Sequence, residues 1–342
     1  MRKRFLLFLL ALLLLLAACG APQVEAPATN EEQPIVSQPA YNQPEPHELP
    51  TIRLALIPVI DTLPMFVAEA EGIFANYGLT VEIIPVASAP ERDQLLAAGQ
   101  ADGTLNEILS VMYFNRDTVQ MQVVRYGHMA APGFGHFFIL ASEQSGITSP
   151  ADLAGVEIGI SQGTIIEYVT DRLLEKNGLS DSQIKTVSVP RIPDRMALLG
   201  SGELKAAVMP DPLAALAIQQ GASIVLDDTQ YPLYGASVIS FRKQFIDENP
   251  AAVRSFVRAI EDAVFIINLQ PRAYSDLLAE KQIVPPSLID DYVIPPFPTM
   301  GVPSQIEWTE ALRWAKSKGL LDTDPSYEES VTDRFLPSII IQ

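Results

Sequence analysis

The sequence has little cysteine and little positive charge, and each shortage excludes a class of protein. Cys19 is the one cysteine among 342 residues, so no disulfide forms within the chain and the fold depends on packing alone. Lys and Arg number 23 against 41 Asp and Glu, which gives a formal net charge of −18. Because nucleic-acid binding needs clustered Lys and Arg to neutralise phosphates, we expect no nucleic-acid partner.

The N-terminus has the parts of a secretory signal peptide in their usual order. Basic residues 2–4 precede an apolar run of 14 residues, 5–18. This run is shorter than the roughly 20 residues that span a bilayer. The ending L-A-A-C at residues 16–19 resembles the lipobox of bacterial lipoproteins, whose cysteine is lipidated and becomes the mature N-terminus. We therefore expect removal of residues 1–18 and lipidation of Cys19, with an ordinary signal peptide and a chance cysteine as the alternative.

The stretch after Cys19 is typical of a disordered tether. Residues 20–50 hold seven prolines, five glutamates and no Lys or Arg, and they lack the apolar periodicity that buries a core. Without the signal peptide, 20 basic residues remain against 41 acidic ones, so the protein has no electrostatic attraction to anionic lipid. We therefore expect residues 19–50 to link a lipid anchor on the extracytoplasmic face of the cell membrane to a globular part.

The globular part contains an internal repeat at an offset of about 100 residues. The first copy has an apolar run at 52–57, a helical pattern from residue 64 and Asn-Tyr-Gly-Leu at 76–79. The second has an apolar run at 156–161, a helical pattern from residue 164 and Lys-Asn-Gly-Leu at 176–179. Alternating strands and helices at this spacing predict parallel sheets with crossover helices. The restart of the pattern favours two α/β lobes over one continuous doubly wound sheet.

Two apolar stretches, 137–141 and 236–241, are placed to cross between the lobes. We therefore expect a first lobe from residues 51–138, a second lobe from 139–236, and a return to the first lobe with C-terminal helices over 237–342. The predicted fold class is α/β, with each lobe a mostly parallel sheet flanked by helices and with two hinge crossovers.

Three motifs resemble one known family. These are P-M-F-V-A-E-A-E-G-I-F at 64–74, L-A-A-G-Q-A-D at 96–102 and S-P-A-D-L-A-G-V-E-I-G-I at 149–160. In this order they are similar to segments of the nitrate-, sulfonate- and thiamine-precursor-binding proteins of ABC transporters. The resemblance implies a type 2 periplasmic binding fold, a small molecule clamped between two lobes, and a permease and an ATPase as partners. It implies a monomer with no cofactor.

The predicted ligand site lies at the carboxyl ends of the strands, where open α/β sheets bind their ligands. The loops after four predicted strands meet at that edge, together with aromatic residues near the loop ends. The candidate ligand-binding residues are Asp61, Thr62, Phe66, Asn106, Glu107, Gln162, Gly163, Thr164, Tyr168, Asp211 and Tyr234.

The same loops indicate what the ligand is. Segments 54–91, 126–171 and 206–241 contain no Lys or Arg, and predicted cleft acids such as Glu107 repel anions. Aromatic rings near the loops suit a flat ligand. These features favour a heteroaromatic nutrient, riboflavin or a thiamine-related pyrimidine. The alternative is a sulfonate such as taurine, or nitrate, bound by backbone N–H groups at the helix that starts near Thr164.

Other functions have less support in the sequence. No Gly-rich phosphate loop and no nucleophile–His–Asp order stands out, so we do not expect an enzyme. His128 and His136 are eight residues apart with no further ligands nearby in the sequence, so we do not expect a metal site. A pyrimidine-synthase-like enzyme and a receptor module for a membrane sensor remain the rival interpretations.

Overall fold

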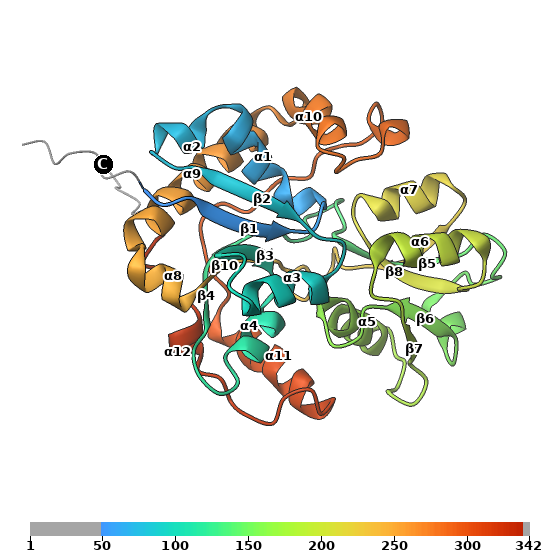
Figure 1. Ribbon diagram of the computed structural model, residues 1–342. Coiled ribbons are helices and arrows are strands. Elements are labelled where there is room, and N and C mark those ends of the chain that lie inside the picture. The colour runs from blue at the N-terminus through green and yellow to red at the C-terminus, as the bar shows by residue number, and fades with distance from the viewer. Residues whose placement is uncertain (1–48, 338–342) are drawn as a thin grey trace, which may run out of the picture. The chain divides into compact units, whose positions relative to one another are not determined.

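Two five-stranded sheets organise the part of the chain that the computed structural model describes, residues 49–337 (Figure 1). The predicted signal peptide, the lipidation of Cys19 and most of the predicted tether fall outside this range. Within it, no helix combines the length and the apolar character needed to cross a membrane.

The first sheet has the strand order β2-β1-β3-β10-β4. In it, β1 pairs in parallel with β2 and β3, while β10 runs antiparallel to both β3 and β4. Its strands are β1 (Ile52–Leu56), β2 (Val81–Pro85), β3 (Gly103–Asn106), β4 (Met121–Tyr126) and β10 (Val238–Arg242).

The second sheet repeats this plan in the order β7-β6-β8-β5-β9. Here β6 pairs in parallel with β7 and β8, and β5 is the antiparallel strand between β8 and β9. Its strands are β5 (Phe137–Ala141), β6 (Glu157–Ile160), β7 (Lys185–Ser188), β8 (Ala206–Pro210) and β9 (Ser223–Asp227). The prediction of an α/β fold with two mostly parallel sheets flanked by helices is therefore confirmed.

The chain passes between the two sheets twice. Residues 127–136 lead from β4 to β5, and residues 228–237 lead from β9 to β10. In each case the strand that follows the crossing is the antiparallel one of its sheet, so β5 and β10 both start at the edge where the neighbouring parallel strands end. The lobe boundaries after residues 138 and 236 stay predictions. The second sheet begins at Phe137.

Helices connect the strands and cover the sheets. Several begin with the expected signals: Ser88 caps α3 and Thr164 caps α5, each accepting from a backbone N–H, and Ser304 with Glu307 forms a capping box at α11. The α-helices are α1 (Leu63–Ala70), α2 (Ile73–Asn76), α3 (Ala89–Ala97), α4 (Ile108–Phe114), α5 (Ile165–Lys176), α6 (Ile192–Ser201), α7 (Leu213–Gln219), α8 (Lys243–Glu248), α9 (Pro250–Leu269), α10 (Ser275–Glu280), α11 (Gln305–Ser317) and α12 (Tyr327–Ser330).

Each sheet has its own apolar core. The long helix α9 packs on α1 and on the first sheet, where the Phe256 ring lies 5.6 Å from Phe74 and 5.3 Å from Phe241. On the other face of this sheet, α11 packs with α4 and buries Trp308 and Trp314. In the second sheet, α5 packs against β5 and β6. These cores hold the strand ends of each lobe in fixed positions.

Candidate functional site

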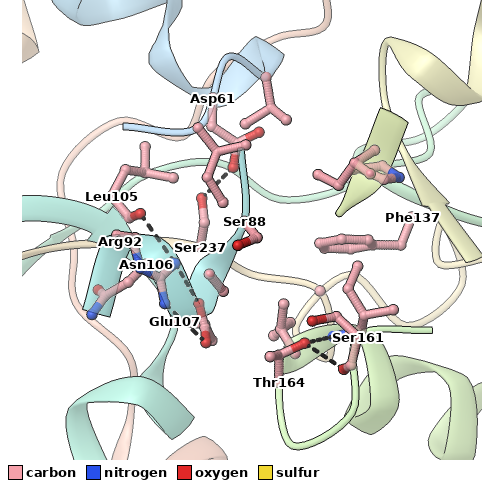
Figure 2. A pocket seen from close by; sticks show the side chains of 18 of the residues that line it. Asp61, Ser88, Arg92, Leu105, Asn106, Glu107, Phe137, Ser161, Thr164 and Ser237 are labelled. Carbon is pink, nitrogen blue, oxygen red and sulfur yellow. Dashed lines mark hydrogen bonds and ion pairs between the residues drawn. The ribbon is translucent and has the colours of Figure 1, made fainter. Parts of the chain in front are cut away.

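A pocket lies where the strand ends of the two sheets face each other (Figure 2). Figure 2 shows Phe137, Ser161 and Thr164 on one side of it and Asp61, Asn106 and Glu107 on the other. Its volume is about 80 Å³. Ligand sites commonly measure roughly 300–1,000 Å³, so the lobes must part to admit a larger solute.

Four of the predicted ligand-binding residues line this pocket: Asp61, Asn106, Glu107 and Thr164. All four follow or end a strand, as the rule for α/β sheets predicts. The Asn106 side chain accepts from Ser240 Oγ at 2.8 Å and donates to Ser110 Oγ at 3.2 Å. Thr164 Oγ1 donates to the Ser161 carbonyl at 2.8 Å, which fixes the turn before α5.

The structure does not bring the other seven predicted residues to this pocket: Thr62, Phe66, Gln162, Gly163, Tyr168, Asp211 and Tyr234. Each has a local reason. The Thr62 hydroxyl is buried and donates to the Val59 carbonyl, and the Phe66 ring packs under Lys281, 5.4 Å away. Gln162 is exposed beside Gly163, whose N–H donates to Glu167 Oε2 at 2.7 Å.

The predicted aromatic platform belongs to a contact between the lobes instead. The Tyr168 ring on α5 lies 5.2 Å from Trp314 on α11 and 5.7 Å from Tyr234. Asp211 accepts a hydrogen bond from the Tyr292 hydroxyl. Burial raises the pKa of Asp211 to about 6, while Tyr292 opposes the rise. Phe137, which is not among the predicted residues, lines the pocket with its aromatic ring, and His136 lies beside it in the lining.

Asp61 is a buried carboxylate whose charge is already compensated. His136 Nε2 lies 3.0 Å from Asp61 Oδ1, and Ser237 Oγ donates to Asp61 Oδ2 at 2.6 Å. Burial opposes both charges, but the pairing outweighs it: the pKa of Asp61 falls well below its usual range and the pKa of His136 rises to about 9. Near pH 7 the pair is therefore an ion pair.

Glu107 is also paired with a buried cation, although burial raises the pKa of this carboxyl. Arg92 on α3 places Nη1 3.2 Å from Glu107 Oε2 and Nη2 3.4 Å from Oε1, while its Nε donates to Asp93 at 2.8 Å. Although burial disfavours the guanidinium charge, Asp93 and Glu107 raise the pKa of Arg92. The two acids near the pocket that suggested repulsion of anions are thus both neutralised.

Arg195 on α6 is the charged residue of the pocket without a counter-charge. It is fully buried, and its Nε and Nη1 donate to the carbonyls of Val208 and Val189 at 2.7 and 2.8 Å. Within residues 49–337 its Nη2 has no hydrogen-bond partner. Burial lowers the pKa of Arg195 to about 10, so the side chain is still positive at pH 7.

Positive charge reaches the pocket from helices and not from the strand-end loops. The loops lack Lys and Arg, as the sequence shows, but the first turns of α3 and α6 supply Arg92 and Arg195. A repeated pattern in the sequence points to these two arginines. The internal repeat extends backwards as Pro-Glu-Arg at 90–92 and Pro-Asp-Arg at 193–195, in both copies three residues before a Leu-Leu pair.

Polar contacts also join the two lobes away from the pocket. Glu91 on α3 pairs with Arg191 at the start of α6, at 2.7 Å. On the α5–α11 side, Asp171 accepts from Trp314 Nε1 at 2.8 Å and lies 3.0 Å from Lys318 Nζ. The lobes are in contact in this structure, and opening the pocket requires breaking such pairs.

The two histidines of the crossover lie against each other, and His136 is the one that pairs with Asp61. Their rings meet edge to face at 4.9 Å, and burial next to the positive His136 lowers the pKa of His128 to about 3. Over residues 49–337, no three His, Cys, Asp or Glu side chains gather in a way that could hold a metal ion.

Comparison with known proteins relates this geometry to a family. A family model described as "NMT1/THI5 like" matches residues 60–273. The riboflavin-binding protein RibY of Chloroflexus aurantiacus is 24% identical, over 98% of this chain and 99% of its own length. The nitrate/nitrite binding protein NrtA of Nostoc sp. is 23% identical, over 73% of this chain and 62% of its own length.

A solved structure supports the fold. The alkanesulfonate-binding protein SsuA from Xanthomonas axonopodis pv. citri, bound to MOPS, superimposes with a TM-score of 0.71. The match covers 83% of this chain and 99% of that protein at 15% identity. This likeness shows a shared two-lobed fold, that of the periplasmic binding proteins.

Proposed function

The chain belongs to the NMT1/THI5-like family, and from that premise we propose that it is the solute-binding component of an ABC importer. It captures a small molecule between its two lobes and delivers it to a permease that works with an ATPase. Cys19 anchors it by lipid to the extracytoplasmic face of the cell membrane, and residues 19–50 give the lobes reach.

The observation that carries this proposal is the pocket itself. It is bounded by strand ends of both sheets, and within residues 49–337 two crossover segments, 127–136 and 228–237, continue the chain between the sheets. Two lobes joined in this way can close around a ligand by a hinge motion, and a permease can then distinguish the closed form.

Two classes of ligand have support. The first is a heteroaromatic nutrient, riboflavin or a thiamine-related pyrimidine; the full-length similarity to RibY favours it, and the Phe137 ring offers a stacking surface. The second is a sulfonate such as taurine, or nitrate. The similarity to NrtA and the uncompensated charge of Arg195 favour this class.

A ligand panel tests the function. We would purify the lipid-free chain from residue 20 to residue 342, record its native mass and absorbance, and measure thermal unfolding with each candidate. A ligand that binds the folded state raises the unfolding temperature. We expect a monomer that one ligand class stabilises selectively, with no turnover. Steady conversion of a bound candidate would contradict the proposal and favour an enzyme.

The anchor needs a separate test. We expect the full chain, expressed in a bacterial host, to fractionate with membranes and to carry lipid mass on a mature N-terminus at Cys19. A Cys19→Ala variant should lose both properties. A mature protein that starts elsewhere and carries no lipid would contradict the anchor while leaving the binding function intact.

A further inference from the structure

Two polar side-chain atoms in the pocket lack partners, and both belong to the second lobe. Within residues 49–337, Arg195 Nη2 and Ser161 Oγ make no hydrogen bond, although both side chains are buried. A buried polar atom without a partner destabilises a fold, so natural proteins satisfy nearly all of them. Both residues line the same pocket, on the side of the second lobe.

The internal repeat explains why Arg195 is left uncompensated. Arg92 and Arg195 stand 103 residues apart, and each donates to the carbonyl of the equivalent strand residue, Leu105 or Val208. The first lobe adds Glu107 two residues after Leu105 and pairs it with the arginine. At the equivalent place, two residues after Val208, the second lobe has Pro210.

The second acid of the first lobe is also missing from the second. Asp93 follows Arg92 and accepts from its Nε, whereas Met196 follows Arg195. The carbonyls of Val189 and Val208 orient the Arg195 guanidinium but carry no negative charge. The first lobe therefore completes its arginine site from its own side chains, and the second does not.

Arg195 differs from the other charged residues that line the pocket. Asp61 pairs with His136, while Glu107 and Asp93 both pair with Arg92. Within residues 49–337 no carboxylate pairs with Arg195, so its positive charge is locally uncompensated. Burial in a low-dielectric site strengthens its attraction for an anion.

We propose that Arg195 Nη2 and Ser161 Oγ form a subsite for an anionic oxygen group of the solute. This inference rests on the proposed binding function and names the class of ligand: a small molecule with a carboxylate, sulfonate, nitrate or phosphate group. That group docks on the second lobe, and the first lobe closes over the rest of the molecule. Phe137, the first residue of β5, lines the part of the pocket next to the subsite.

The test compares pairs of probes, each with one anionic and one neutral member. Methanesulfonate and methanesulfonamide form one pair, and flavin mononucleotide and riboflavin form another. We expect calorimetric titration of the wild-type protein to show binding about 10- to 100-fold tighter for the anion of at least one pair, as a charged hydrogen bond implies. Arg195→Met should abolish this preference, and Arg195→Lys should keep part of it.

Ser161→Ala is the second variant. It should weaken anion binding by less than Arg195→Met does, because it removes one neutral donor. Ligand-free thermal unfolding of each variant checks folding, and we expect Arg195→Met to stay folded with a small loss of stability, because it removes a buried charge without a counter-charge but also two hydrogen bonds to carbonyls.

The outcomes separate the subsite from the function. An Arg195→Met protein that folds and keeps the anion preference would overturn the subsite. So would a wild-type protein that, in every pair it binds, prefers the neutral member or shows no preference, while the proposed function would survive. A wild-type protein that binds no member of either pair, and none of the broader panel above, would count against both.

Discussion

The two lobes use the same arginine in opposite ways. In the first lobe, Arg92 is enclosed by Glu107 and Asp93 and forms a finished ion-pair network. In the second lobe, Arg195 occupies the equivalent place on α6, donates to two backbone carbonyls and meets no carboxylate within residues 49–337. The same structural repeat therefore supplies carboxylate partners for the arginine in the first lobe and none for the arginine in the second.

This difference separates structural from binding charge. A buried charge with a built-in partner stabilises the fold only while both members are present. A buried charge without one is a cost in the empty protein and a gain when a ligand brings the opposite charge. The charged side chains that the first lobe contributes to the pocket are already paired, whereas Arg195 of the second lobe can attract an anionic ligand.

The largest expected effect is on stability. Arg92→Met leaves Glu107 buried without its partner and should lower the free energy of unfolding by about 3–5 kcal/mol. Arg195→Met is the matched change in the other lobe and should lower that free energy by less, because it leaves two carbonyls without a donor but no buried charge without its partner. Urea unfolding of both variants measures the contrast. Equal losses would show that the two arginines do the same work.

The next effect concerns pH. Asp61 raises the pKa of His136 from its ordinary value of 6.5 to about 9, so the pair stabilises the folded state fully below about pH 6.5 and progressively less as the pH rises through 9. The whole shift corresponds to about 3 kcal/mol. His136→Gln should flatten the unfolding free energy between pH 6.5 and about 9. If the dependence of the unfolding free energy on pH is the same in the variant, Asp61 and His136 do not form the ion pair described.

A smaller effect, on anion affinity, is expected when the second lobe is given the carboxylate that the first lobe has. Pro210→Glu places a carboxylate at the position equivalent to Glu107, where it can pair with Arg195. We expect anion affinity to fall by about 10- to 100-fold, since the new carboxylate competes with the ligand. Pro210→Gln is the control for lost proline and added bulk. Equal affinities of the two variants would speak against competition.

The smallest effect is expected at Arg191, which lies one turn before Arg195 and is half exposed. Its pair with Glu91 is a solvent-exposed bridge between lobes, and such pairs contribute roughly 0–1 kcal/mol. Arg191→Ala should therefore change stability by no more than that and should leave the anion preference intact. Loss of the preference would place recognition at the rim instead of at Arg195.

The sequence predicts the fold well because the fold repeats. Two copies of strand, helix, Gly and strand, offset by about 100 residues, indicate two sheets without any knowledge of contacts. It also predicts four pocket residues, because Asp61, Asn106, Glu107 and Thr164 lie at strand ends, whose position in an α/β sheet is general.

The rest of the site depends on packing between distant segments. Tyr168 was predicted to bind ligand, yet Trp314, 146 residues further along, packs against it, and no local pattern announces that contact. Arg92 and Arg195 point to the cleft because the first turns of α3 and α6 start beside it. The repeated Pro-acid-Arg pattern marks both arginines in the sequence, but the structure is needed to show that they line the pocket.

The uncompensated Arg195, and not the paired Arg92, is the arginine that should receive the ligand. A crystal structure with methanesulfonate bound tests this most directly. We expect a sulfonate oxygen about 3 Å from Arg195 Nη2, with Arg92 still paired to Glu107. A sulfonate held by Arg92, or by neither arginine, would contradict it.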